Sequence, residues 1–300
     1  MLLDSGEKIP TQKRCTTSSG QSICYVQTGS GPPLLLIHGL LGGSFCWRLN
    51  LPVFEKRFTT YAVDLPGCGE SANPRNGDCG MRAQAGHLLS VLSELGLKQV
   101  DVVGSSWGGG VALLLAASNP ELVRSLVLVS PVNPWSEFGR ERVRFFSGAL
   151  GAALLRMGTP FSRPLHLWGL KRMYGDPRRM PAGTLEGYSR LFLRKGLARN
   201  IVGMLRSWEG DLEALKSATE RVQAPTLLVW GTHDTAVDPG SAEILRAKMR
   251  NCKLEMIEGA GHVPFEETPD EFNRVTLDFL ERVDTAQQGL IGRSGEKAIR

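Results

Sequence analysis

Residues 100–117 read VDVVGSSWGGGVALLLAA. The first four are mostly β-branched and apolar, which is typical of a strand inside a sheet, and the last seven form an apolar helical run. Between them Ser106 is flanked by Gly104 and Gly108 in the spacing Gly-x-Ser-x-Gly. A strand, a tight turn and a helix in direct succession predict a serine at the tip of the turn with its hydroxyl exposed.

The two glycines give this turn a physical reason. Such a turn leaves no room for side chains two residues before and two residues after the serine, and glycine has none. The helix that starts at Trp107 directs its N-terminal N–H groups toward the serine, where they can stabilise negative charge. We therefore interpret Ser106 as a catalytic nucleophile. The simpler alternative is a glycine-rich turn between a core strand and a helix.

A serine hydroxyl is a weak nucleophile near neutral pH and needs a base that a carboxylate orients. His262 lies in the loop 259–264 after a late apolar run, from which it can reach back over the sheet edge. Asp234 follows the apolar run Thr226–Trp230. We predict a triad in the chain order Ser106, Asp234, His262. The other histidines, at positions 38, 87, 166 and 233, are expected to have structural or surface roles.

Two further assignments concern neighbouring loops. Asp238 is the second candidate for the acid, but it lies four residues further on, where it is better placed to begin the next helix. For the oxyanion hole we predict two backbone N–H donors, one from Trp107 and one from Leu40. Leu40 follows His38-Gly39 and the apolar run Leu34–Ile37, although His38-Gly39 can also be a simple turn that ends a strand.

Strand and helix patterns alternate along most of the chain. A short antiparallel hairpin is expected around Thr16 and Ile23–Gln27. Buried strands are expected at Leu34–Ile37, Thr60–Val63, Val100–Val103, Leu126–Val129, Thr226–Trp230 and Leu254–Ile257. Helical patterns occur at Phe45–Phe58, Ala83–Leu95, Trp107–Ala117, Ala242–Met249 and Asp270–Val283. This order predicts an α/β fold with a parallel sheet and helices on both faces.

The alternation breaks after Val132. From there to about Ala214 the segments look helical and no buried-strand pattern appears, and Pro131 and Pro134 suit the edge of an inserted unit. We therefore expect a core of residues 1–132 and 215–286, an inserted helical cap of residues 133–214, and a flexible tail of residues 287–300.

The cap carries the positive charge of the chain. Residues 135–210 contain fourteen basic and five acidic residues, a balance of +9, whereas the whole chain has a net charge of +5. We prefer the simpler interpretation, in which these side chains are solvated on helix faces. The sharper hypothesis is that the cap attracts an anionic substrate or an anionic membrane surface. We interpret the apolar stretch 145–157 as the roof of a pocket rather than a helix in a lipid interface.

The composition of the chain limits the classes of protein to which it can belong. With 42% hydrophobic and 22% charged residues the chain is typical of globular proteins. No apolar run approaches the roughly 20 residues of a membrane span, and residues 1–14 lack the apolar stretch of a secretory signal, so we expect a cytoplasmic protein. The six cysteines lack metal-ligand and disulfide spacing. We expect a small-molecule substrate, no metal, no cofactor and no nucleic acid; the sequence carries no signature of an oligomeric state.

Together these residues resemble the α/β-hydrolase superfamily, in particular its single-chain capped serine hydrolases. The resemblance covers most of the chain and rests on His38-Gly39, on the segment 64–71 (DLPGCGES), on the serine turn, and on the loops of Asp234 and His262. It implies a mostly parallel eight-stranded sheet with a helical cap inserted after the sixth strand.

Departures from related groups narrow the resemblance. Relatives that open haloalkanes or epoxides carry an aspartate nucleophile, so Ser106 argues against both activities. Carbon–carbon bond hydrolases tend to have Asn before the serine and Trp after the histidine, where this chain has Ser105 and Val263. Proline iminopeptidases have a Gly-Pro oxyanion loop, which the segment 40–43 (LLGG) does not match, and they need acidic residues where the cap is basic.

The expected function is hydrolysis of a carboxylic ester with an apolar acyl or aromatic group, through an acyl-enzyme on Ser106. Two alternatives stay open. The first is a carbon–carbon bond hydrolase that acts on a vinylogous keto acid. The second, from another class, is a non-catalytic binding module on the same fold; such modules usually lose a triad member, and none is missing here.

Overall fold

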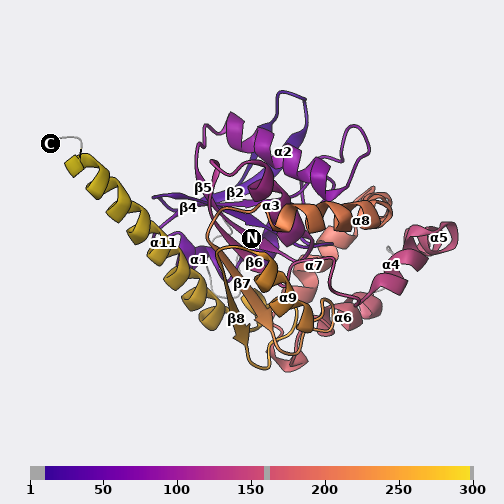
Figure 1. Ribbon diagram of the computed structural model, residues 1–300. Helices are drawn as coiled ribbons and strands as arrows, with labels where there is room; N and C mark the ends of the chain where they lie inside the picture. The colour runs from indigo at the N-terminus through magenta and orange to yellow at the C-terminus, as the bar shows by residue number, and fades with distance from the viewer. Residues whose placement is uncertain (1–10, 159–162, 298–300) are drawn as a thin grey trace.

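An eight-stranded sheet lies at the centre of the molecule (Figure 1). The structure is a computed structural model and describes residues 11–158 and 163–297. The strand order is β1-β2-β4-β3-β5-β6-β7-β8; β2 pairs antiparallel with β1 and β4, and all later pairs are parallel. The strands are β1 Gln12–Thr16, β2 Ser22–Thr28, β3 Pro33–Ile37, β4 Thr59–Val63, β5 Val100–Ser105, β6 Val123–Val129, β7 Thr226–Gly231 and β8 Cys252–Ile257. The predicted α/β fold with a mostly parallel sheet is confirmed.

Helices cover both faces of the sheet, which explains the continuous apolar runs. In β3, Leu35 and Ile37 join one apolar cluster while Leu34 and Leu36 join the other, because side chains alternate across a strand. One cluster includes side chains of α2 Met81–Glu94, α3 Trp107–Ser118, α8 Leu197–Thr219 and α9 Gly240–Lys248. The other includes side chains of α1 Leu51–Phe54, α10 Pro264–Glu267 and α11 Pro269–Lys297.

The single helix expected at Phe45–Phe58 is wrong. The structure has a short 3-10 helix η1, Ser44–Trp47, and then α1, which starts at Leu51. Pro52 lies in the first turn of α1, and proline is tolerated there but breaks a helix interior, where it lacks an N–H. Asn50 between the two pieces donates its side-chain N–H to Phe265 O (3.1 Å) and to Asn273 Oδ1 (2.8 Å), which fixes the break.

Between β6 and β7 the described residues form helices and no strand. These are α4 Arg140–Ser147, α5 Ala149–Gly158, α6 Arg163–Lys171, η2 Pro177–Arg179, α7 Thr184–Phe192 and α8. Helix α8 runs through the expected boundary at 214/215 without interruption, and within it the Asp211 carboxylate accepts the N–H of Met81 (3.1 Å) at the start of α2. The cap boundaries 133 and 214 therefore stay a prediction.

The tail expected at residues 287–300 is helical as far as Lys297, because α11 continues through it. No proline follows Pro269, so no residue in this stretch lacks the N–H that a helix needs. Residues 298–300 lie outside the described residues. Within the described part of the chain, no helix combines the length and apolarity needed to cross a bilayer. The six cysteines carry free thiols.

Candidate active site

Ser106 occupies the turn between β5 and α3 in a strained backbone conformation. Its φ is +52° and its ψ is −115°, a combination that costs about 1–3 kcal/mol for a residue other than glycine. Hydrogen bonds hold it there: its N–H donates to Val129 O (2.8 Å), and its carbonyl accepts from Val132 N (3.0 Å). The strained turn is thus fixed to β6 and to the chain that leaves β6.

Three glycines make the close packing around this turn feasible. A Cβ atom at Gly108 would lie 2.3 Å from His38 O, and one at Gly104 would lie 2.5 Å from Gly108 O. These are backbone contacts that cannot move aside, which is the requirement inferred from the sequence. A Cβ atom at Gly39 would lie 3.2 Å from Ser106 Cβ, so the loop after β3 also approaches the serine closely.

His262 and Asp234 form a buried pair. The His262 Nδ1 and Asp234 Oδ2 atoms are 2.8 Å apart, and the other carboxylate oxygen accepts the N–H groups of Ala236 (2.7 Å) and Val237 (3.0 Å). Burial alone would raise the pKa of Asp234, but His262 and the two N–H donors outweigh it, so the pKa lies below its ordinary value. The ionised carboxylate therefore orients the imidazole through Nδ1 and leaves Nε2 for the cavity.

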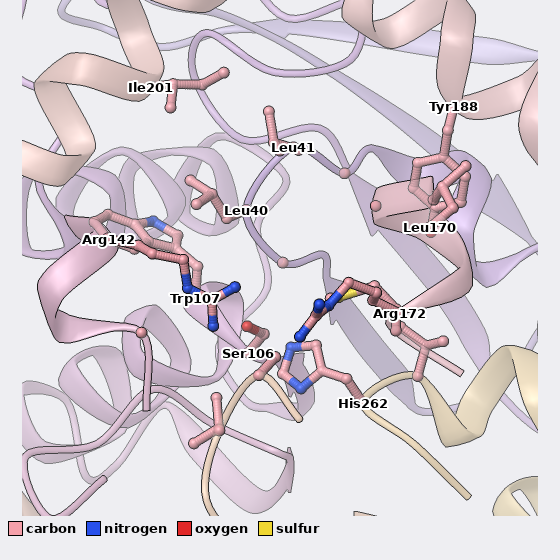
Figure 2. A pocket seen from close by; sticks show the side chains of 18 of the residues that line it. Leu40, Leu41, Ser106, Trp107, Arg142, Leu170, Arg172, Tyr188, Ile201 and His262 are labelled. Atoms are coloured by element: carbon pink, nitrogen blue, oxygen red, sulfur yellow. The ribbon is translucent and has the colours of Figure 1, made fainter. Parts of the chain in front are cut away.

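The structure brings the three predicted residues to one edge of the sheet. Ser106 and His262 line the same cavity, and Figure 2 shows their side chains beside each other. Among the described side chains no hydrogen bond joins the Ser106 hydroxyl to the imidazole, which is common before a substrate closes the site. Asp238, the second candidate acid, instead accepts the N–H of Gly240 (2.9 Å) at the start of α9.

The two predicted oxyanion donors lie at the same cavity. Trp107 is the first residue of α3, so its N–H has no acceptor within the helix. Leu40 lies in the loop after β3, and Figure 2 shows it close to Trp107 at the wall of the cavity. His38 is fully buried and holds this loop, because its Nδ1 bonds Gly39 O (2.7 Å) and its Nε2 accepts Leu65 N–H (3.0 Å). Burial lowers the pKa of His38, which suits this structural role.

The cavity has a volume of about 750 Å³ and a mainly apolar lining. Its walls come from the loop after β3, from the serine turn and from helices of the cap. The apolar stretch 145–157 contributes four lining side chains, Phe145, Phe146, Leu154 and Leu155, as expected for a roof. An apolar acyl chain or aromatic group fits such a lining better than a small polar molecule.

A buried ion pair beside His262 was not predicted from the sequence. Glu266 is 1% exposed; it lies 3.2 Å from an Arg48 guanidinium nitrogen and accepts the hydroxyls of Tyr174 (2.7 Å) and Tyr188 (2.5 Å). Burial and the Glu266 charge raise the pKa of both tyrosines, which therefore stay protonated donors. Because Arg48 and Glu266 are 218 residues apart, no local pattern could have paired them.

Glu267 was also missed, although it fixes the loop of His262. The carboxylate is buried and accepts three backbone N–H groups, those of Gly261 (2.7 Å), Gly175 (2.9 Å) and Asp176 (2.8 Å). The first belongs to the histidine loop and the other two to the cap. The only signal in the sequence was a pair of glutamates shortly after the histidine, and acidic residues in a helix's first turn are commonplace. Within the described residues no cluster of side chains is arranged to hold a metal ion.

Comparisons with known proteins identify the family and the fold. The profile of the alpha/beta hydrolase fold family matches residues 32–269. Lipase 1 of Psychrobacter immobilis is 28% identical over 266 residues, which cover 86% of this chain and 80% of the lipase. An uncharacterized hydrolase of Bacillus subtilis is 26% identical over 273 residues, which cover 88% of this chain and 96% of that protein. The solved meta-cleavage product hydrolase of Pseudomonas fluorescens has the same fold, with a TM-score of 0.76 at 21% identity over 90% of this chain and 97% of that one.

Proposed function

The chain belongs to the alpha/beta hydrolase fold family, and on that premise we propose that it cleaves carboxylic esters through an acyl-enzyme formed on Ser106. The observation that carries the proposal is the buried His262–Asp234 pair, of which His262 lines one cavity together with a serine held in a strained turn. A base that a carboxylate orients is what a serine needs to attack a carbonyl near neutral pH.

In the proposed reaction the Ser106 hydroxyl attacks the ester carbonyl while His262 Nε2 takes its proton. Asp234 holds Nδ1–H and stabilises the imidazolium that forms. The oxyanion of the tetrahedral intermediate accepts hydrogen bonds from the N–H groups of Leu40 and Trp107. The imidazolium then gives its proton to the leaving alcohol. In the second half of the cycle His262 deprotonates a water molecule, which attacks the acyl carbonyl and releases Ser106.

Turnover of p-nitrophenyl esters of increasing acyl length tests the proposal. We expect the wild-type protein to hydrolyse medium-length acyl esters better than acetate, because the cavity is large and apolar. Ser106→Ala should lower kcat by at least about a thousandfold, since it removes the attacking oxygen. Circular dichroism of both proteins controls for folding. Equal turnover by the wild type and Ser106→Ala would refute the proposed nucleophile.

The same panel separates the alternatives. Turnover of a ring-cleavage keto acid tests the first alternative, in which the protein hydrolyses a carbon–carbon bond instead of an ester bond. Preference for the keto acid over every ester would favour that activity. Absence of turnover of both substrate classes by the folded wild-type protein would favour a binding module.

A further inference from the structure

Two arginines of the cap reach into the mainly apolar cavity over the candidate nucleophile. Arg142 belongs to α4 and Arg172 directly follows α6, and both line the cavity together with Ser106 and His262. Figure 2 shows their guanidinium groups pointing toward the space over Ser106 and His262 from opposite sides. Both side chains also keep contact with solvent, so their charges stay hydrated when the site is empty.

Contacts with the loops of the predicted acid and base fix the position of Arg172. Its carbonyl accepts the hydroxyl of Thr235 (3.0 Å), the residue after the acid. The carbonyl of the next residue, Met173, accepts the backbone N–H of His262 (2.7 Å). The guanidinium lies 5.0 Å from the ring centroid of Trp168, a cation–π contact that orients it.

Arg142 is positioned from the other side, through the chain that leaves β6. Val132 in that chain donates its N–H to the carbonyl of the nucleophile. Further along, Arg140 at the start of α4 donates to Pro134 O (2.6 Å) and Ser136 O (3.0 Å), which fastens the helix to the same chain. Arg142 lies two residues later in that helix. Both arginines are thus anchored independently to segments that touch the candidate triad.

The other charges at the cavity already have partners. Glu266 is paired with Arg48, and Asp234 with His262. In contrast, neither Arg142 nor Arg172 forms an ion pair with any described residue. The cavity therefore offers two unpaired guanidinium groups beside an apolar lining. Guanidinium matches the oxygens of a carboxylate or phosphate with two parallel hydrogen bonds.

We infer that Arg142 and Arg172 form an anion-binding subsite, so that the substrate carries a carboxylate or phosphate group close to the scissile carbonyl, in addition to an apolar chain. This inference rests on the proposed ester hydrolysis and narrows its substrate class. The apolar chain fills the roof side of the cavity, and the two arginines hold the anionic group over the serine. Neutral esters are then hydrolysed, but without the orientation that the arginines give.

Calorimetric binding to the Ser106→Ala protein tests the subsite without any turnover. The probes are octanoate, octyl phosphate and octanol, which share one chain length and are used below their micelle concentrations. We expect one or both anions to bind at least about tenfold more tightly than octanol, the value of a charged hydrogen bond. Arg142→Gln and Arg172→Gln should each reduce that preference by about tenfold. Tight binding of only one anion identifies which group, carboxylate or phosphate, the site takes.

Two neighbouring substitutions serve as matched controls. Lys171→Gln and Arg144→Gln remove the same charge from the residue beside Arg172 and from the same helix as Arg142, yet neither residue lines the cavity. We expect both to keep the preference for anions. If the controls lost the preference for anions as much as Arg142→Gln and Arg172→Gln, the effect would come from the overall charge of the cap and the subsite would be wrong. Equal affinity for octanol and both anions in the Ser106→Ala protein that keeps all its arginines would also overturn the subsite.

The proposed function and the subsite fail in different ways. If Ser106→Ala hydrolyses esters like the wild type but the anions still bind through the two arginines, the serine mechanism is wrong and the subsite stands. If turnover depends on Ser106 but the anions show no preference, the subsite is wrong and the serine mechanism stands.

Discussion

At the scale of single residues, the interaction between Asp234 and His262 depends on the charge of the carboxylate as well as on its position. The carboxylate of Asp234 is buried, and its negative form is stabilised by the imidazole and by two N–H donors. Its pKa in the folded protein is therefore lower than in the unfolded chain, where a value near the ordinary 3.8 applies. Its contribution to stability is fully present above that value and is lost as the pH falls through the lower folded pKa.

The lowered pKa of Asp234 predicts how the stability of the Asp234→Asn variant depends on pH. We expect the variant to unfold at a lower temperature than the wild type at pH 7, and the difference to shrink below about pH 4. Ester turnover at pH 7 should fall by roughly four orders of magnitude, because an amide cannot hold the required tautomer. Asp238→Asn, four residues away, is the matched control and should change turnover little. A larger loss in Asp238→Asn than in Asp234→Asn would exchange the two assignments.

The sequence indicated Ser106 and Asp234 because each follows a buried strand, β5 and β7. The strand before His262, β8, was also expected to be buried but is largely exposed, so His262 was indicated by its loop and by the chain order of the three residues. The sequence did not contain the role of Glu266 or Glu267. Their partners Arg48 and Gly175 lie far away in the chain, and only the folded structure brings them together. Long-range polar contacts of this kind leave no periodic pattern.

At the scale of elements, Glu267 in α10 connects the histidine loop to the cap. It accepts three backbone N–H groups, and each buried donor left without a partner costs about 1–3 kcal/mol. We expect Glu267→Ala to lower the free energy of unfolding by roughly 3 kcal/mol and kcat by about tenfold, because the loop of His262 loosens.

A conservative variant of Glu267 distinguishes its role in positioning the loop of His262 from a general loss of packing. Glu267→Gln keeps an acceptor oxygen and should recover part of the stability and turnover. Denaturant unfolding and ester kinetics of both variants measure these effects. Glu271→Ala, an exposed glutamate in α11, is the control and should be neutral. Unchanged kcat in Glu267→Ala would show that the loop of His262 does not need this contact.

Elements buried on both faces were predictable, and elements set by local interruptions were not. The apolar runs of β3 and β5 identified both strands, because helices cover both of their faces. The break between η1 and α1 depends on side-chain bonds of Asn50 to residues more than two hundred positions later, which no window of the sequence includes.

At the scale of the whole molecule, the exposed apolar side chains are concentrated on the cap. Figure 1 shows α4, α5 and α6 on the side of the molecule away from α11. Among the described residues, eight large hydrophobic side chains of the segment 138–193 are exposed, against three elsewhere. The eight are Phe138, Phe145, Leu150, Leu154, Met157, Leu165, Trp168 and Leu193, and the three are Leu89, Ile244 and Met256. Five of the eight, Phe138, Phe145, Leu154, Leu165 and Trp168, also line the cavity, whereas Leu150, Met157 and Leu193 do not. Together with the positive charge of the same segment, these three suit contact with an anionic lipid surface.

Vesicle binding tests whether this surface meets lipid. If the surface meets lipid, the protein should co-sediment with vesicles that contain anionic lipid at low salt and be released at high salt, where charges are screened. Leu150→Ser should weaken binding, because Leu150 is 67% exposed in the cap and does not line the cavity. Ile244→Ser in α9, 44% exposed, is the control and should bind like the wild type. No association of the wild type at low salt would exclude the membrane hypothesis, and attraction of an anionic substrate would then be the hypothesis for the positive charge of the cap.

Composition and order predicted the sheet and the helical insertion, but not the shape of the space between them. The cavity depends on side chains from six or more separate segments, so its volume and its two arginines became visible only in the folded chain. For the same reason the sequence could indicate only in general terms an apolar substrate, with an anionic substrate as a further hypothesis from the charge of the cap.

The most direct test of the central claim is labelling of the folded wild-type protein with a fluorophosphonate probe, followed by mass spectrometry of its peptides. A serine activated by a neighbouring base forms a stable phosphonate ester, whereas an ordinary serine does not react. We expect the label on Ser106, its loss in Ser106→Ala, and strongly reduced labelling in His262→Ala. Label on another serine, or equal labelling of Ser106→Ala and the wild type, would contradict the assignment of Ser106 as the nucleophile.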